Sequence, residues 1–261
     1  MPASAGASGD SLLDRIVRAK RAEIPEIKLS GHYPGKPASL YQALRRPSGQ
    51  KVRVIAECKK ASPSMGLMRE NYDPAEIALT YANLGASAIS VLTDRNFFQG
   101  QIDHIALARA AGIPILRKDF IISREQIFEA REKGADAILL IVRLLSDDQI
   151  LSFLELASSL GMDSLLEVHN REEAIRASES GGQIIGINHR DLDTLVMNMN
   201  LTPQIAPLLR EKNPDAVIVA ESGVESREGR NLVDAYVDAV LIGTAFMKSL
   251  DIPSTWKELF S

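Results

Sequence analysis

Charged residues lie at or just after three of the apolar, strand-like runs in this chain. Glu57 and Lys59 end the first run, Lys118 follows the third and Glu167 lies in the fifth. Side chains two positions apart in a strand point to the same face, so Glu57 and Lys59 share one side. If the strand ends meet, these crowded carboxylates and ammonium groups suit acid–base catalysis near neutral pH. The alternative is a set of ordinary strand-end ion pairs, with Glu167 favouring the N-terminus of a helix.

Small residues follow the last two apolar runs. Ser222 and Gly223 come after the seventh run, and Gly243 and Thr244 come after the eighth. Turn chemistry alone could explain either pair. Together they occur where many parallel barrels bind phosphate through backbone N–H groups. We therefore predict a phosphate site in the loops after these two runs.

Strand and helix patterns alternate eight times, which determines how these residues can meet. Amphipathic stretches separate the apolar runs, and several of them end in a glycine that stops a helix: Gly85, Gly112, Gly134, Gly161 and Gly182. Eight such units predict an α/β protein, a (β/α)8 TIM barrel in which all strand ends face one catalytic rim. A doubly wound open sheet also alternates, but no G-x-G-x-x-G turn follows the first run. The predicted strands are Val52–Ala56, Ala88–Leu92, Ile113–Leu116, Ala137–Val142, Ser164–Val168, Ile184–Ile187, Ala216–Ala220 and Ala239–Ile242.

The residues ahead of the first strand differ from the repeating body. Leu12–Ile24 has the spacing of an amphipathic helix, and a second short helix is predicted at Ser39–Arg46, before Pro47. We expect a mobile tail at residues 1–11, a helical N-terminal extension at 12–50 and a single barrel catalytic domain at 51–261. The first residues have no apolar segment typical of a secretion signal.

Composition argues against several classes of protein. The net charge is −4 without a strongly basic stretch, which disfavours nucleic acid and anionic membranes as partners. The single cysteine, Cys58, fits a reducing compartment, and no run of about 18 apolar residues predicts a membrane span. The four histidines lack metal-ligand spacing. We expect a cytoplasmic protein without a metal site.

The strand-end motifs resemble those of the indole-3-glycerol phosphate synthase family. The resemblance covers essentially the whole chain from about Leu12, including the helical extension. It implies the decarboxylating, dehydrating ring closure of 1-(2-carboxyphenylamino)-1-deoxyribulose 5-phosphate to indole-3-glycerol phosphate in tryptophan biosynthesis, a carboxy-lyase reaction. The motifs occur in order: IAECKKASPS (Ile55–Ser64), LRKDFI (Leu116–Ile121), LLEVHN (Leu165–Asn170), IGINHRDL (Ile185–Leu192), AESG (Ala220–Gly223) and LIGTAFM (Leu241–Met247).

The resemblance also implies roles for single residues. Lys118 would protonate the substrate ketone, and Glu167 would transfer protons; Glu57 and Lys59 would either assist dehydration or position the substrate. The implied catalytic set is Glu57, Lys59, Lys118, Glu167, Asn188 and Ser222. The implied substrate-binding set is Ser62, Phe120, Leu139, Arg190 and Glu221, and the phosphate-binding set is Gly223, Gly243 and Thr244. No metal or organic cofactor is implied. The implied partner is a phosphorylated small molecule, with other tryptophan-pathway enzymes as further partners.

Two other functions compete with this interpretation. A phosphate-binding barrel isomerase, such as the phosphoribosylanthranilate or histidine-pathway isomerases, would use a carboxylate or a Cys/Asp pair. The lysines at the first and third strands disfavour that chemistry. A catalytically silent barrel that serves as a binding module would be expected to lack at least one charged strand-end residue, and none is missing.

Overall fold

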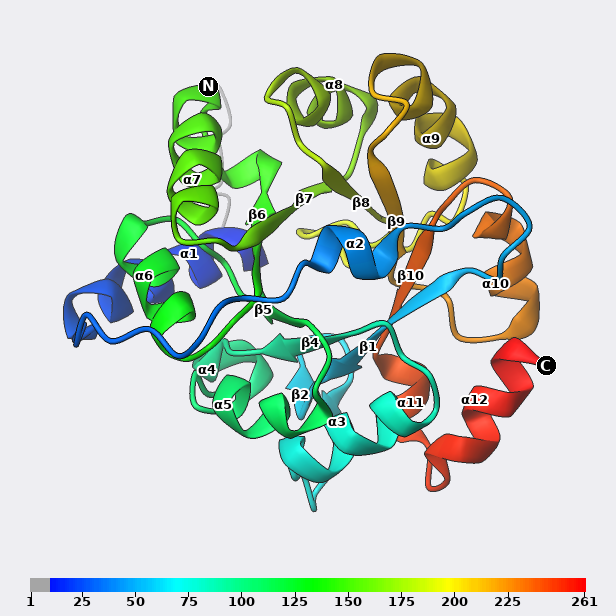
Figure 1. The fold of residues 1–261 in the computed structure, drawn as a ribbon, viewed down its shortest axis with the longest axis horizontal. Helices are drawn as coiled ribbons and strands as arrows, with labels where there is room; N and C mark the ends of the chain where they lie inside the picture. Colours follow the sequence, from blue (N-terminus) through cyan, green and yellow to red (C-terminus); the bar gives the residue numbers. More distant parts are fainter. Residues whose placement is uncertain (1–9) are drawn as a thin grey trace, which may run out of the picture.

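A computed structural model of the protein describes residues 10–261 and shows eight parallel strands closed into a barrel (Figure 1). The strands neighbour one another in the order β1-β10-β9-β8-β7-β6-β5-β4. The predicted (β/α)8 TIM barrel is therefore confirmed. Of the predicted mobile tail, residues 1–9 lie outside the described part of the chain. The strands are β1 (Arg53–Cys58), β4 (Ala88–Leu92), β5 (Ile115–Lys118), β6 (Ala137–Ile141), β7 (Asp163–Val168), β8 (Ile184–Asn188), β9 (Val217–Glu221) and β10 (Ala239–Ile242).

Several strands continue beyond the apolar runs into the polar residues that follow them. β1 extends to Cys58, and β5 ends at Lys118 instead of Leu116. Polar side chains that point into the barrel leave the backbone ladder intact, so Leu92 still pairs with Lys118 and Asn188 with Glu221. The backbones of these candidate site residues are consequently fixed by the sheet itself.

Helices cover the outside of the barrel (Figure 1). Side-chain caps begin several of them: Ser146, Asn170 and Ser226 each accept a backbone N–H from the first turn. The outer helices are α3 (Pro74–Asn83), α4 (Arg95–Phe98), α5 (His104–Ala108), α6 (Arg124–Glu132), α7 (Asp147–Ser159), α8 (Arg171–Glu179), α9 (Leu201–Lys212), α10 (Arg227–Asp234), α11 (Thr244–Lys248) and α12 (Ile252–Phe260). Single turns at η1 (Ile24–Glu26), η2 (Arg109–Ala111) and η3 (Val142–Leu144), and a hairpin of β2 (Ala61–Ser62) and β3 (Gly66–Leu67), complete the loops.

Four of the five glycines predicted to stop helices have the left-handed backbone conformation typical of a helix end, and the fifth does not. The first four predicted stops have left-handed φ angles. After α8, however, Gly181 has the left-handed φ, of 81°. Gly182 instead packs so closely on Leu166 that an added Cβ would clash with it. The prediction for that helix was wrong by one residue.

Apolar side chains form two layers on opposite sides of the barrel wall. Outward-facing strand residues such as Ile138 and Ile185 pack against the outer helices. Cys58 is fully buried in this outer layer. Inward-facing residues such as Ile55 and Leu139 fill the barrel interior.

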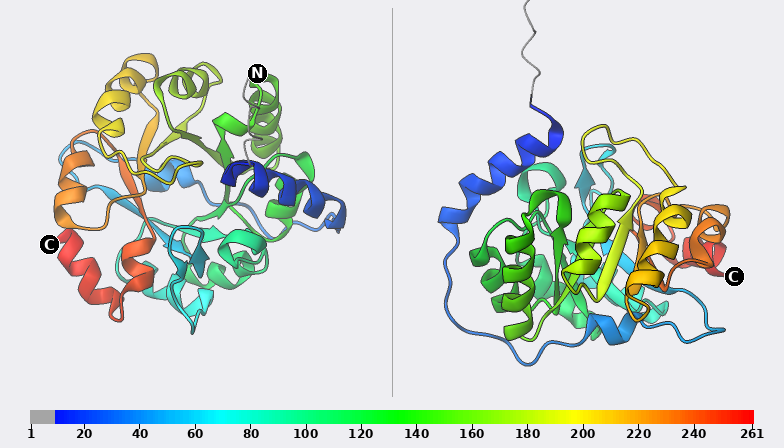
Figure 2. Two further views of the ribbon diagram at one scale, coloured as in Figure 1. Left: turned by 180° about the vertical axis from the view of Figure 1, so that it is seen from behind. Right: turned by 90° about the horizontal axis from the view of Figure 1, so that it is seen from above.

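Two N-terminal helices contribute to the inner layer from opposite ends of the barrel. Helix α1 (Leu12–Glu23) lies across the end where the strands finish, and α2 (Leu40–Leu44) lies at the other end (Figure 2). Residues 27–39 connect them along the outside, where Arg131 of α6 donates to the carbonyls of Pro34 and Gly35. The predicted extension is thus packed against both ends of the barrel.

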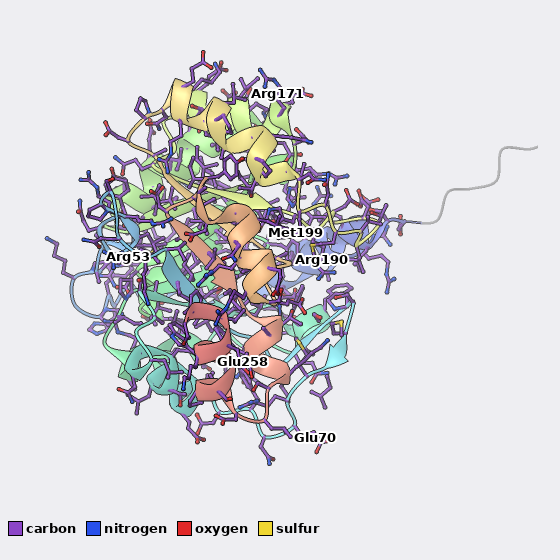
Figure 3. All side chains as sticks on the ribbon, turned by 90° about the vertical axis from the view of Figure 1, so that its right-hand side faces the viewer. Arg53, Glu70, Arg171, Arg190, Met199 and Glu258 are labelled. Atoms are coloured by element: carbon purple, nitrogen blue, oxygen red, sulfur yellow. The ribbon has the colours of Figure 1, made fainter. Side chains whose placement is uncertain are left out.

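The strands begin and finish at opposite ends of the molecule. Arg53, at the start of β1, and Arg190, just after β8, lie on opposite sides of the molecule (Figure 3). The candidate site residues gather at the end of Arg190. In residues 10–261, no helix has the length and apolar character needed to cross a membrane.

Candidate active site

One pocket at the carboxyl ends of the strands contains the whole predicted site. All fourteen predicted site residues line it. They come from β1, β5, β6, β7, β8, β9 and β10 or the loops that follow these strands. The structure therefore brings together side chains that are far apart in the sequence, as the strand-end interpretation required.

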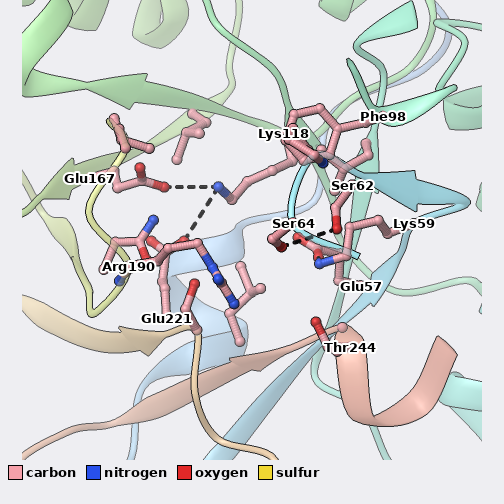
Figure 4. Close-up of a pocket in the computed structure, with 18 of the residues that line it drawn as sticks. Glu57, Lys59, Ser62, Ser64, Phe98, Lys118, Glu167, Arg190, Glu221 and Thr244 are labelled. Atoms are coloured by element: carbon pink, nitrogen blue, oxygen red, sulfur yellow. Dashed lines mark hydrogen bonds and ion pairs between the residues drawn. The ribbon is translucent and has the colours of Figure 1, made fainter. Parts of the chain in front are cut away.

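Lys118 lies between two carboxylates in the middle of this pocket (Figure 4). Its Nζ donates to Glu167 Oε2 at 2.8 Å and lies 3.6 Å from Glu221 Oε2. Both glutamates are about 1% exposed. Burial disfavours the Lys118 ammonium, but the negative charges of Glu167 and Glu221 outweigh this effect and raise the pKa of Lys118. The lysine is consequently a firmly protonated donor before substrate binds.

The two carboxylates beside Lys118 titrate differently. Burial opposes ionisation of Glu167, but Lys118 and His169 outweigh burial and lower the pKa of Glu167. For Glu221, burial and the neighbouring Glu167 charge prevail over Lys118 and raise its pKa. Because the two glutamates share one ammonium, a charged and a neutral carboxyl group lie side by side at neutral pH.

Glu57 and Lys59 form a second ion pair on the opposite wall of the pocket (Figure 4). Lys59 Nζ lies 2.7 Å from Glu57 Oε1, so the two charged side chains at the end of β1 do contact each other. A Cβ at position 243 would clash with the Glu57 carboxylate. Gly243, predicted for its phosphate-binding backbone, is therefore also required by the space that Glu57 occupies.

Apolar side chains form one end of the pocket. Phe120 and Leu139 lie there as predicted. Phe98 stacks at a tilt against Phe120, with ring centroids 6.1 Å apart. Leu12 and Ile16 of α1 also line the pocket. The sequence had not indicated these last three residues, because helical spacing shows that a face is apolar without showing what it covers.

The residues after β9 and β10 form another part of the pocket lining. Ser222 and Gly223, after β9, both have left-handed φ angles, of 64° and 75°. Gly243 and Thr244 face the same pocket from the end of β10. The strained Ser222 backbone turns successive N–H groups in a direction that an ordinary extended segment does not offer. This geometry suits an anion such as a phosphate group.

Polar side chains from β2, from β8 and from the loops after these two strands complete the lining. The hydroxyl oxygens of Ser62 and Ser64 lie 3.4 Å apart, shortly after Lys59 in the chain. Asn188 accepts the backbone N–H of Arg190 at 3.1 Å, and Arg190 donates to the Leu195 carbonyl. These contacts orient Arg190 along the rim of the pocket (Figure 4).

His169 is a contact of Glu167 that the sequence analysis missed. It lies two residues after Glu167, and its Nε2 is 3.2 Å from Glu167 Oε1. The two-residue spacing that had paired Glu57 with Lys59 would have found it. His189, by contrast, points away from the pocket and contacts the Ser222 carbonyl and the Thr202 hydroxyl.

The described residues contain no cluster of three or more His, Cys, Asp or Glu side chains that could hold a metal ion. The chemistry open to this pocket is proton transfer between carboxyl and ammonium groups around a bound anionic molecule. A flat apolar group would fit the end at Phe120, and a phosphate would fit the backbone N–H groups at the other end.

Comparison with known proteins gives a consistent result over nearly the whole chain. The model of the indole-3-glycerol phosphate synthase family matches residues 13–259. The indole-3-glycerol phosphate synthase of Leptospira interrogans is 47% identical over 250 residues, covering 95% of this chain and 97% of its own. That of Acetivibrio thermocellus is 44% identical over 260 residues, covering 95% and 98%. That of Roseiflexus is 42% identical over 265 residues, covering 96% and 98%.

A solved structure of a different protein shares the architecture. The thiamine phosphate pyrophosphorylase from Pyrococcus furiosus superposes with a TM-score of 0.57 at 17% sequence identity. The match covers 80% of this chain and 93% of that one. At so low an identity, this likeness bears on the fold alone.

Proposed function

The chain belongs to the indole-3-glycerol phosphate synthase family, and on that premise we propose how its pocket residues divide the reaction. It is a carboxy-lyase of tryptophan biosynthesis that closes the ring of 1-(2-carboxyphenylamino)-1-deoxyribulose 5-phosphate to give indole-3-glycerol phosphate. The reaction forms one carbon–carbon bond and releases carbon dioxide and water. Ring closure and dehydration each need a proton donor or acceptor at a defined place.

Lys118 is the proposed proton donor for ring closure. As the arene carbon attacks the substrate ketone, negative charge develops on the ketone oxygen and must be neutralised. Lys118 Nζ, 2.8 Å from Glu167 Oε2, is a partly buried ammonium that lines the pocket, and this contact is the observation that carries the proposal. Loss of the carboxylate as carbon dioxide then restores the aromatic ring and needs no further proton.

Glu167 is the proposed proton-transfer partner of Lys118. Its lowered pKa keeps it ionised, so it can accept a proton after Lys118 has donated one. Dehydration requires both an acid at the departing hydroxyl and a base at the ring proton. The Glu57–Lys59 pair on the opposite wall supplies a second carboxylate and ammonium for that step or for holding the substrate.

The remaining pocket residues are proposed to bind the substrate. Ser62, with Lys59 nearby, would contact the substrate carboxylate, and Phe120 with Leu139 would pack on its aromatic ring. Asn188 and Arg190 would hold the chain hydroxyls, in a wall completed by Glu221 and Ser222. The backbone N–H groups at Gly223, Gly243 and Thr244 would bind the phosphate.

We also propose that the enzyme acts in the cytoplasm beside other enzymes of the tryptophan pathway, and that it needs no cofactor. Cys58 is a free, buried thiol, which fits a reducing compartment. The proposed steps are proton transfers that amino-acid side chains can perform. The phosphorylated substrate itself is small and anionic, in keeping with a pocket that has backbone donors at one end.

An assay with the carboxyphenylamino substrate tests this proposal. The purified protein is mixed with substrate in buffer containing a metal chelator, and the fluorescence of the indole product is followed. We expect product to form at the same rate with and without the chelator. No product at micromolar enzyme concentration would contradict the assignment, and inhibition by the chelator would contradict the proposed independence from metal.

A further inference from the structure

A buried histidine that the proposed chemistry does not use contacts the second oxygen of Glu167. Glu167 Oε2 accepts from Lys118, whereas Glu167 Oε1 lies 3.2 Å from His169 Nε2. The other ring nitrogen, Nδ1, lies 3.1 Å from Glu173 Oε2. His169 is only 9% exposed. The ring thus lies between two carboxylates, one from β7 and one from α8.

Glu173 is fixed independently of the histidine ring. It belongs to the first turn of α8 and is 6% exposed. Its Oε2 accepts the backbone N–H of His169 at 2.8 Å, and its Oε1 accepts from the Asn170 side chain at 2.7 Å. Donors at both oxygens fix the position of the Glu173 carboxyl group. Glu173 therefore holds the ring of His169 in one orientation.

The two contacts together determine the charge of the ring. A neutral imidazole carries no charge to pair with either carboxylate, whereas an imidazolium forms an ion pair with both: with Glu167 by a charge contact at Nε2, and with Glu173 by a contact at Nδ1 that is also a hydrogen bond. Burial disfavours the imidazolium, yet Glu167 and Glu173 outweigh burial and raise the pKa of His169 to about 9. Four groups of alternating charge then lie in a row from the pocket into α8: Lys118, Glu167, His169 and Glu173.

Two cations on the surrounding elements, Lys118 and Arg176, have partners of their own. Lys118 of β5 contacts Glu167 and Glu221, the latter on β9. Arg176 of α8 is held by Asp147 and by backbone carbonyls of η3 and the loop after it.

We propose that His169 is a positioning residue for catalysis: as an imidazolium braced by Glu173, it keeps Glu167 ionised and aims the free oxygen of that carboxylate at Lys118. The inference rests on the proton-transfer role proposed for Glu167 and extends it to a second layer of side chains. A loss of the positive ring would let Glu167 rotate or take up a proton, and Lys118 would lose its fixed partner. Turnover would then fall while substrate binding changed little.

A double-mutant cycle tests whether His169 acts through Glu167. His169→Gln keeps an N–H that can reach Glu167 but removes the positive charge. We expect it to lower kcat roughly 10- to 100-fold, because loss of an adjacent opposite charge weakens ionisation of a carboxyl group by about that factor, with KM within about twofold. In an enzyme that already carries Glu167→Gln, the same change should cause no further loss. A merely structural histidine would instead cost the same factor in both backgrounds.

A matched substitution separates the charge from general damage. His104→Gln makes the same chemical change at a half-buried histidine that packs on Tyr72, away from the pocket. It should leave kcat unchanged. Glu173→Gln should reproduce the effect of His169→Gln, because it removes the brace. The thermal unfolding midpoint of each variant shows whether the fold is kept.

Nitrogen NMR of the unmodified protein gives an independent measurement. With histidine labelled on its ring nitrogens, the His169 signals, assigned by their loss in His169→Gln, should show both nitrogens protonated at pH 7. A neutral ring at pH 7 would overturn the proposal, as would equal losses in both arms of the cycle. If Glu167→Gln is impaired but His169→Gln is not, the positioning role of His169 is overturned while the role of Glu167 stands. A fully active Glu167→Gln would overturn the role of Glu167 and this inference with it.

Discussion

Lys118 contacts two carboxyl groups, Glu167 and Glu221, whose pKa values are shifted in opposite directions. One ammonium can neutralise one carboxylate, and Glu167, which also contacts His169, keeps its charge. Burial and the neighbouring Glu167 charge raise the pKa of Glu221, and its distance of 3.6 Å from Lys118 Nζ leaves it with the weaker share of that ammonium. The pocket therefore holds an ionised and a neutral carboxyl group side by side, which suits the proton transfer proposed for Glu167 and a hydrogen bond from Glu221 to a substrate hydroxyl.

Glu221→Gln tests the neutral state of Glu221. Its raised pKa means that Glu221 is protonated at neutral pH and becomes charged as pH rises through that pKa. We expect wild-type kcat/KM to fall on the alkaline side for this reason. The variant, which stays neutral at every pH, should lose that alkaline limb and remain within about tenfold of wild type at pH 7. Profiles of kcat/KM from pH 6 to 10 measure this; Glu211→Gln, on the exposed surface, is the control. An identical alkaline limb in the variant would contradict the assignment.

At the scale of elements, one buried lysine fixes α1 over the pocket. Lys20 is 1% exposed, and its Nζ lies 2.9 Å from each of three carboxylates. Glu23 belongs to α1, whereas Asp94 and Asp119 follow β4 and β5. Because Leu12 and Ile16 of the same helix line the pocket, the position of α1 determines the shape of the apolar end.

Lys20→Met should release this helix. The change leaves Asp94 and Asp119 buried without their shared cation, which costs on the order of 3–5 kcal/mol of unfolding free energy. KM should rise severalfold, since the apolar end of the pocket loses its cover. Urea unfolding and steady-state kinetics measure the two effects. Arg21→Met, on the exposed side of the same helix, should change neither. An unchanged unfolding free energy in Lys20→Met would show that the cluster does not anchor α1.

The same cluster should contribute to acid stability. Burial opposes ionisation of Asp119, but Arg117 and Lys20 outweigh burial and lower its pKa from 3.8 to about 2. A carboxyl group whose pKa is lower in the folded state stabilises the fold at pH values above its pKa in the unfolded chain. That stabilisation is lost as the pH falls through about 2, the folded-state pKa of Asp119. Wild type should therefore exceed Asp119→Asn in unfolding free energy at pH 6, with the gap narrowing between pH 4 and 2. A constant gap over this range would contradict the proposed origin of the effect.

At the scale of the whole molecule, the barrel has one end for chemistry and one for stability. The charged pocket lies where the strands finish, while Leu40 and Leu44 of α2 are fully buried at the other end. This division follows from the parallel arrangement, which places the loops after all eight strands on one rim.

Leu44→Ala tests that division. The truncation leaves a cavity at the closed end of the barrel and should cost about 2–5 kcal/mol of unfolding free energy. Below the unfolding transition, kcat and KM should match wild type, because no pocket residue moves. Leu29→Ala, at an exposed leucine, should leave both stability and kinetics unchanged. A large fall in kcat for a folded Leu44→Ala enzyme would show that the two ends are coupled.

The sequence predicted the barrel and the residues that meet at its mouth, because apolar runs and their polar ends are local patterns. Glu57, Lys118 and Glu167 could be found in this way. The sequence did not predict that Glu221 shares Lys118 with Glu167, since that contact depends on how β5, β7 and β9 lie across the closed barrel. Helical spacing likewise could not show that α1 covers the pocket or that α2 fills the far end. Such contacts arise from packing over long distances in the chain.

The turnover of Lys118→Ala tests the central claim most directly. The variant is compared with wild type by the indole fluorescence assay, with thermal unfolding as the check on folding and Lys212→Ala, a surface ion-pair lysine, as the control. We predict that Lys118→Ala lowers kcat by about 100-fold or more while the fold is kept, and that the control matches wild type. Wild-type turnover in a folded Lys118→Ala enzyme would contradict the account.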